Sequence, residues 1–106
     1  QMLYAYDDTD LVASFLVSTG LDRYPTEPGQ YHIYAKMRYS DMRDFDYYLP
    51  DVPYTMYYSG DFSIHGTYWH HSFGTRMSHG CINLPTDEAG WLFNFASVGT
   101  VVNIHQ

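Results

Sequence analysis

Turn-forming residues interrupt this sequence every few positions, so that no apolar stretch in it is long. Short apolar runs between Gly, Pro, Asp, Asn and Ser are typical of strands joined by tight turns. Residues 2–6 and 11–17 flank the polar segment 7–10 and predict a hairpin. The chain is therefore expected to be mainly β, with packed mixed sheets and a single helix.

The middle of the chain also shows short apolar segments separated by turn-forming residues. Residues 31–38 alternate between two faces and predict a half-buried strand, preceded by a Gly- and Pro-containing loop over 18–30. Residues 39–53 mix aspartates with aromatic residues and predict a surface loop, either a functional lid or a connection without a role. Further strands are expected over residues 54–58, 62–65 and 100–105.

The one predicted helix follows residue 85. Thr86 is expected to cap it, Asp87 and Glu88 suit the positive end of its dipole, and Gly99 follows its end. The aromatic and apolar residues of one face should pack into the core; these are Trp91, Leu92 and Phe95. Gly90 weakens the helix by ~1 kcal/mol relative to alanine.

Composition limits the function classes. The chain has 106 residues, which suits one domain over residues 1–106, and its net charge of −7 excludes a dominant phosphate-binding surface and so nucleic-acid binding. With 19% aromatic and 16% charged residues it should fold and not remain disordered. No apolar run approaches the ~20 residues of a membrane span, and any secretion signal is expected to lie outside this chain.

The only cysteine, Cys81, lies in a stretch that also holds four of the six histidines. Because a thiol becomes a nucleophile when an imidazole takes or holds its proton, the stretch first suggests nucleophilic catalysis, with Gly80 allowing backbone N–H groups to face an oxyanion. A zinc site is a second reading, although structural zinc sites usually have two or more cysteines. In a third, the histidines are surface groups and Cys81 is buried filler.

The segment from Ser78 to Asn83, Ser-His-Gly-Cys-Ile-Asn, resembles the signature of the L,D-transpeptidase (YkuD-type) catalytic domain. His65-Gly66 matches the upstream His of that family. The early Ser18-Thr19-Gly20 and the segments 25–36 and 87–93 are similar to further family patterns, so that the resemblance covers nearly the whole chain. It implies an L,D-transpeptidase-like β-sandwich.

The resemblance also implies an activity. The family cleaves peptidoglycan tetrapeptide stems before the terminal D-Ala, forms a thioester, and passes the acyl group to an amine of a second stem, giving a 3→3 cross-link. It implies an extracytoplasmic location, in periplasm or cell wall, inhibition by carbapenem β-lactams, and no cofactor or metal. We expect a monomer.

Carried onto this sequence, the resemblance makes Cys81 the nucleophile and His65 the general base, oriented by the Gly66 carbonyl. His79 is expected to shape the pocket, and the N–H groups of Gly80 and Cys81 to form an oxyanion hole. The remaining candidates hold the loop or the substrate: Ser78, Asn83, Tyr58 and Arg76. Lys36 and Arg38 are further candidates to bind stem carboxylates.

Two alternatives to transpeptidation remain open at this point. A hydrolase, such as an L,D-carboxypeptidase, would share the fold and use water as the acceptor. A non-catalytic wall-binding module would need neither His65 nor Cys81, so the presence of both argues against it.

Overall fold

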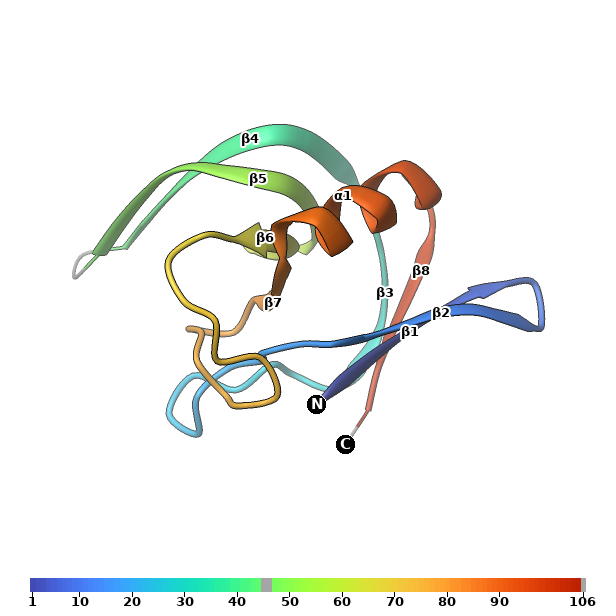
Figure 1. Ribbon diagram of the computed structural model, residues 1–106, viewed down its shortest axis with the longest axis horizontal. Coiled ribbons are helices and arrows are strands. Elements are labelled where there is room, and N and C mark those ends of the chain that lie inside the picture. The colour runs from blue at the N-terminus through green and yellow to red at the C-terminus, as the bar shows by residue number, and fades with distance from the viewer. Residues whose placement is uncertain (45–46, 106) are drawn as a thin grey trace.

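The computed structural model describes residues 1–44 and 47–105, and these form eight strands and one helix (Figure 1). The strands are β1 (Met2–Asp7), β2 (Asp10–Leu16), β3 (Gly29–His32), β4 (Ala35–Asp44), β5 (Tyr47–Ser59), β6 (Phe62–Thr67), β7 (Ile82–Pro85) and β8 (Val101–Ile104), and the helix is α1 (Thr86–Phe95). The expected mainly β class with one helix is confirmed.

Three sheets are formed by these strands. β1 and β2 make the predicted antiparallel hairpin, and β3 pairs antiparallel with β8. The largest sheet has the order β4-β5-β6-β7, antiparallel except for the parallel pair β6–β7. Helix α1 packs against β5, β6 and β7 of this sheet. A parallel edge formed by β6 and β7 thus carries both the His65-Gly66 pair and the residues that follow Cys81.

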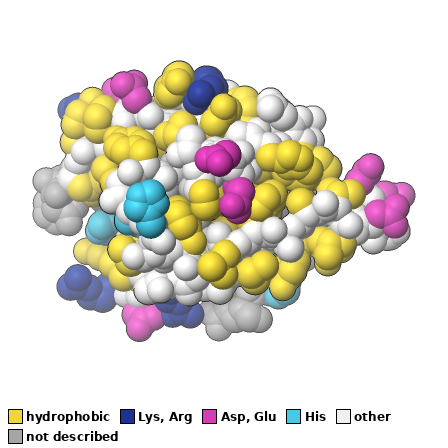
Figure 2. Space-filling model, in the orientation of Figure 1, with side chains coloured by type: hydrophobic (Ala, Val, Ile, Leu, Met, Phe, Trp, Pro, Cys, Tyr) yellow, Lys and Arg dark blue, Asp and Glu magenta, His cyan; other side chains and the backbone are white. Residues whose placement is uncertain are grey.

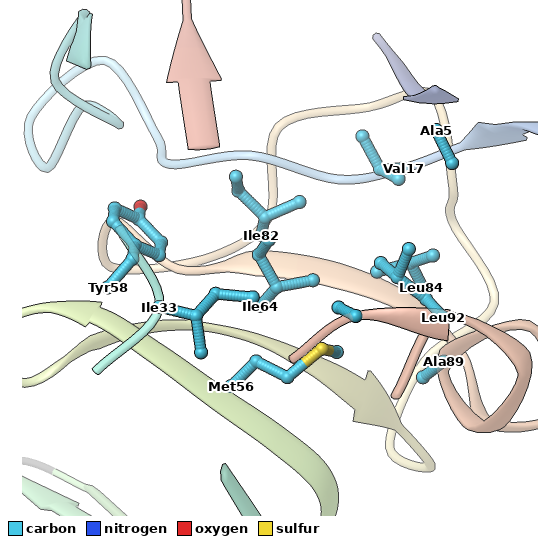
Figure 3. Packing of buried hydrophobic residues seen from close by; sticks show 11 residues of the cluster. Ala5, Val17, Ile33, Met56, Tyr58, Ile64, Ile82, Leu84, Ala89 and Leu92 are labelled. Atoms are coloured by element: carbon cyan, nitrogen blue, oxygen red, sulfur yellow. The ribbon is translucent and has the colours of Figure 1, made fainter. Parts of the chain in front are cut away.

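The core lies between α1, the largest sheet and the segment that follows β2 (Figure 3). Met56 and Leu84 are fully buried there, and Ile64 of β6 lies directly opposite Ile82 of β7. The strands that carry the candidate site are therefore fixed by apolar side chains on their other face, since successive residues of a strand point to opposite sides.

The predicted strand over residues 31–38 is wrong in one respect, because it is two strands in different sheets. The N–H of Ile33 donates to Thr100 O, next to β8, whereas the N–H of Tyr34 donates to Tyr57 O of β5. The backbone therefore changes partner between these two residues. Met37 shares a face with Ile33 in the predicted strand, but it is 47% exposed whereas Ile33 is buried.

The predicted surface loop over residues 39–53 is also wrong, apart from residues 45–46, which lie outside the described residues. The rest belongs to the long β4–β5 hairpin, in which Tyr39 faces Pro53 and Ser40 faces Val52. Its far end projects on the opposite side of the molecule from the tip of the β1–β2 hairpin (Figure 1).

Helix α1 departs from expectation at two points. Thr86 is its first residue, and the cap position is Pro85, with no side-chain cap hydrogen bond. Trp91 is 42% exposed and stacks on Phe95, 5.1 Å away, in place of entering the core. Gly90 is buried, and a Cβ there would lie 3.0 Å from the Tyr54 ring, so close packing against β5 explains the glycine.

The distribution of basic side chains on the surface agrees with the net charge of −7, which excluded a dominant phosphate-binding surface. On the face shown in Figure 2, Lys and Arg side chains are scattered among apolar ones and do not gather into a basic patch. Within the described residues, no helix has the length and apolar character that a membrane crossing requires.

Candidate active site

Cys81 lies at the end of a tight loop that leads directly into β7. Gly80 has φ of +124°, and a Cβ at this position would lie 2.4 Å from the Phe62 ring, so both the backbone conformation and the available space require glycine. The Ser78 hydroxyl donates to the carbonyl of Cys81 and accepts from the N–H of Gly80 at 3.2 Å. Ser78 therefore holds the loop, and it also engages one of the two N–H groups expected in an oxyanion hole.

The sulfur of Cys81 is surrounded by polar groups of β6 and of the turn before it. The Ser63 hydroxyl donates to Sγ at 3.7 Å, and the thiol points to the carbonyl oxygen of Asp61 at 4.0 Å. Burial raises the pKa of the Cys81 thiol, the Asp61 charge raises it further, and the Ser63 hydrogen bonds oppose the shift. The resting thiol is therefore protonated at neutral pH.

His65 is a buried imidazole with a defined orientation. Only 2% of the residue is exposed, and its Nδ1 lies 2.8 Å from the carbonyl oxygen of Gly66. Because a carbonyl oxygen can only accept, Nδ1 carries the proton and Nε2 is left with its lone pair. Burial lowers the pKa of His65 to about 4, and the nearby His70 contributes to the lowering. The imidazole is thus neutral at pH 7 and able to accept a proton.

The parallel pair β6–β7 brings the strand that carries His65 beside the segment that follows Cys81. His65 faces Asn83 in this pair and Ile64 faces Ile82, which brings Ser63 beside Cys81, as their contact shows. Because residues two apart share a face at a spacing of about 6.6 Å, His65 lies on the same face of β6 as Ser63, one side-chain row beyond the Cys81 contact.

The low pKa of His65 makes folding stability depend on pH. Its folded pKa of about 4 lies below the ordinary value of 6.5, so the unfolded chain binds more protons between these values. We expect the free energy of unfolding to fall as the pH decreases from 6.5 to 4, by on the order of 3 kcal/mol from this group. Urea unfolding at pH 7, 5.5 and 4.5 measures it, and His65→Asn should remove this part of the slope. An equal slope in that variant would contradict the assignment.

His79, next to the cysteine loop, is enclosed by two aromatic rings from distant segments. Tyr47 at the start of β5 stacks on it at 5.0 Å with an interplanar angle of 9°, and the Tyr24 ring lies 4.6 Å away. His79 therefore joins the cysteine loop to the far part of the β4–β5 hairpin and to the 18–28 segment. This contact fits a pocket-shaping role better than a proton-transfer role.

Asn83 forms its hydrogen bonds with segments other than the loop that carries Cys81. Its backbone exchanges two hydrogen bonds with Ser18, of 2.8 and 3.0 Å, and its buried side-chain amide lies 3.2 Å from Nε2 of His70. His70 is consequently half-buried and not a free surface group, whereas His71 is exposed.

The remaining candidate residues are placed as follows. Tyr58 is 6% exposed and packs against Tyr31 at 5.2 Å; burial raises its pKa, and so does the charge of the nearby Cys81. Arg76 pairs with the exposed Asp22 at the surface. The other two cationic candidates already have partners within the chain. Lys36 donates to the carbonyl of Ala96 at 2.7 Å, and the Arg38 guanidinium lies 3.8 Å from the centre of the Tyr54 ring.

A pocket of about 400 Å³ reaches Cys81 from the side of the β4–β5 hairpin. Its walls are Asp41, Met42, Arg43 and Tyr47 of the hairpin, Tyr57 of β5, and Asp61. Among residues 1–44 and 47–105, no three His, Cys, Asp or Glu side chains gather in an arrangement that could hold a metal ion.

Sequence reasoning did not single out Ser63, Asp61 or Tyr47. Ser63 could have been found from its position two residues before His65, on the same face of a strand. Asp61 and Tyr47 carry no such signal, because each reaches the site only through the arrangement of β5, β6 and their connecting turn.

Comparisons with known proteins assign the chain to a family. The L,D-transpeptidase catalytic domain family (YkuD) matches residues 1–104. A probable L,D-transpeptidase ErfK/SrfK of Salmonella typhimurium is 41% identical over 58 residues, which are 52% of this chain and 19% of that protein. The chain thus spans well under two thirds of this relative's length.

Two solved structures show the same fold over nearly the whole chain. An L,D-transpeptidase from Enterococcus faecium superposes with a TM-score of 0.91 at 25% identity, covering 99% of this chain and 46% of that one. The L,D-transpeptidase LdtMt1 in complex with imipenem superposes with a TM-score of 0.84 at 27% identity, covering 91% of this chain and 50% of that one. The β-sandwich expected from the resemblance is confirmed, and the chain belongs to the L,D-transpeptidase catalytic domain family, which is a family of enzymes.

Proposed function

We propose that this chain catalyses acyl transfer from peptidoglycan tetrapeptide stems through a thioester on Cys81, forming 3→3 cross-links. The observation that supports it most is a neutral, buried imidazole, oriented by the Gly66 carbonyl, on the same strand face as Ser63, whose hydroxyl contacts the Cys81 thiol. A wall-binding module would gain nothing from this arrangement, because a buried neutral histidine costs stability at low pH.

The pKa directions favour general-base catalysis over a preformed ion pair. Both resting groups are neutral, since burial raises the pKa of Cys81 and lowers that of His65. In the proposed first step, Sγ attacks the carbonyl carbon before the terminal D-Ala while Nε2 of His65 takes the thiol proton. The C–N bond then breaks, the departing amine receives that proton from His65, and the thioester remains.

The developing oxyanion needs donors close to the sulfur. The N–H of Cys81 is the candidate at the loop, because Ser78 already accepts from the N–H of Gly80. Such a donor contributes about 3 kcal/mol to transition-state stabilisation in comparable enzymes. Movement of Ser78 on substrate binding would release the N–H of Gly80 as the second donor.

We further propose a substrate and a cellular location for this domain. A stem peptide with a terminal D-Ala offers the amide that a cysteine acyltransferase of this family attacks, and peptidoglycan is an extracytoplasmic polymer. We therefore propose that residues 1–106 act as a catalytic domain in the periplasm or cell wall. Carbapenems are the expected inhibitors, in line with the imipenem complex of the similar protein.

Purified disaccharide-tetrapeptide tests the proposal directly. Incubation with the protein should yield a dimer whose mass equals two substrate molecules minus one D-alanine. If water is the acceptor, the product is a tripeptide that has lost one D-alanine and gained one water. Mass spectrometry of the products distinguishes the two results. Unchanged tetrapeptide, together with folded protein and a free thiol, would contradict the proposed function.

A further inference from the structure

The first residues of β6 contact the cysteine loop at two points. The Phe62 ring lies so close to Gly80 that a Cβ at that glycine would be 2.4 Å from it. The next residue, Ser63, directs its hydroxyl to Sγ of Cys81 at 3.7 Å. Because the ring contact fixes the loop against β6, the hydroxyl and the sulfur are held next to each other by the fold itself.

The Ser63 hydroxyl is buried and has the sulfur as its partner. Ser63 is 0% exposed, and Sγ is the only hydrogen-bond partner of its hydroxyl among the residues that the structure describes. A thiol sulfur is a weak acceptor, whereas hydrogen bonds to an ionised group are about twice as strong as neutral ones. The bond is therefore weak while Cys81 is a thiol and becomes strong when the sulfur carries negative charge.

Asp61, in the turn before β6, acts on the same sulfur in the opposite sense. Its carbonyl oxygen lies 4.0 Å from Sγ and can only accept, so it favours the protonated thiol. The charge of Asp61 also raises the pKa of Cys81, as burial does, whereas the hydrogen bonds of Ser63 lower it. Of these contacts with the sulfur, the one made by Ser63 favours the thiolate.

We propose that Ser63 is a further catalytic residue, whose hydroxyl stabilises the Cys81 thiolate as it forms. The inference rests on the proposed thioester chemistry and deepens it. In the first step the thiol proton passes to Nε2 of His65, while Ser63 keeps its own proton and directs it to the developing charge. When the C–S bond of the thioester later breaks, the sulfur takes the electron pair and the same hydroxyl donates to it again. No bond to Ser63 forms or breaks.

The proton transfer from thiol to imidazole needs such a donor. Burial lowers the pKa of His65 to about 4 and raises the pKa of Cys81, so the transfer is uphill in the resting site. A hydrogen bond that is stronger in the transition state than in the resting enzyme lowers the barrier, whereas one of constant strength does not. The Ser63 hydroxyl meets this condition, because its acceptor gains charge during the step.

The pKa of Cys81 tests this role without peptidoglycan. The rate of alkylation by iodoacetamide as a function of pH reports the thiolate fraction, and Cys81 is the only thiol in the chain. Ser63→Ala should raise the pKa of Cys81 by about one pH unit. A merely loosened site would show the opposite sign, because loss of burial lowers the pKa of a thiol.

Thr55→Val is the matched control. Thr55 is also 0% exposed and lies on the neighbouring strand β5, but its hydroxyl donates to the carbonyl of Val52 at 3.1 Å. The variant loses a buried hydroxyl of the same sheet and should leave the pKa of Cys81 unchanged. Asp61→Asn, which removes the charge and keeps the backbone carbonyl, should lower that pKa.

Acylation by a carbapenem at pH 7 gives the second readout. The rate should fall roughly tenfold in Ser63→Ala and stay near that of the original protein in Thr55→Val. An unchanged or lowered pKa of Cys81 in Ser63→Ala, or acylation at the original rate, would overturn the role of Ser63. If the pKa shifts as expected but the original protein forms no thioester with disaccharide-tetrapeptide, the proposed function fails while the effect of Ser63 on the thiolate stands.

Discussion

Replacing Cys81 by alanine is expected to abolish both cross-linking and hydrolysis of tetrapeptide stems, because no other thiol exists in the chain. The melting temperature should change little, since the side chain is only half-buried and its hydrogen bonds are long, at 3.7 and 4.0 Å. Product masses and a thermal melt, measured on the same preparation, check both parts. Residual turnover above background would remove Cys81 from the role of nucleophile.

Replacing His65 by alanine is expected to slow acylation by roughly 10²-fold or more, the usual contribution of a positioned base. The rate of thioester formation measures this effect on protein whose far-ultraviolet circular dichroism shows it to be folded. His71→Ala is the matched control, because His71 is exposed and lies in the same loop region; its rate should stay near that of the original protein. His70→Ala should also change the rate little.

One pattern of results would show that His65 is not the general base. Large losses in His70→Ala and His79→Ala, with His65→Ala tolerated, would transfer the role to the loop histidines. The structure argues against this pattern, since His79 is stacked on Tyr47 and also contacts the tilted ring of Tyr24. Its replacement should instead loosen the β4–β5 hairpin and alter substrate affinity.

The choice of Cys81 and His65 as candidates rested on the resemblance to the L,D-transpeptidase signature, because the residues alone left a catalytic, a zinc-binding and a buried-filler reading open. His65 and Cys81 are 16 positions apart, and the chemistry of a thiol beside an imidazole constrains what such a pair can do. The requirement for glycine at position 80 also followed from local reasoning, and its φ of +124° agrees with it. Local chemical patterns of this kind depend little on the rest of the fold.

The β4–β5 hairpin was not predictable because its second strand lacks a period-two pattern. Pro50 and Pro53 interrupt it, and Asp51 and Tyr54 adopt φ values of 51° and 52°, which strands rarely contain. Pairing with β4 overrides these local preferences. The walls of the pocket were missed for the same reason, since Arg43 and Tyr47 reach the cysteine only through that pairing.

The exposure of Trp91 shows that the burial of helix residues also depends on neighbouring elements and not on local sequence alone. Its spacing places it beside Leu92 and Phe95; Leu92 enters the core and the half-buried Phe95 packs against it, whereas Trp91 stays exposed. Phe15 of β2 lies 5.6 Å from the Trp91 ring, so the indole joins an aromatic group at the surface. Helical spacing predicts which residues share a face, whereas the neighbouring strands decide how much of that face is covered.

The central claim is that Cys81 is an activated, accessible nucleophile, and intact-protein mass spectrometry after brief exposure to a carbapenem tests it most directly. The strained lactam carbonyl resembles the donor amide, so ring opening by the thiol should add one carbapenem mass to the protein. The adduct should be stoichiometric, absent in Cys81→Ala and formed much more slowly in His65→Ala. An unmodified mass from folded protein with a free thiol would contradict the account.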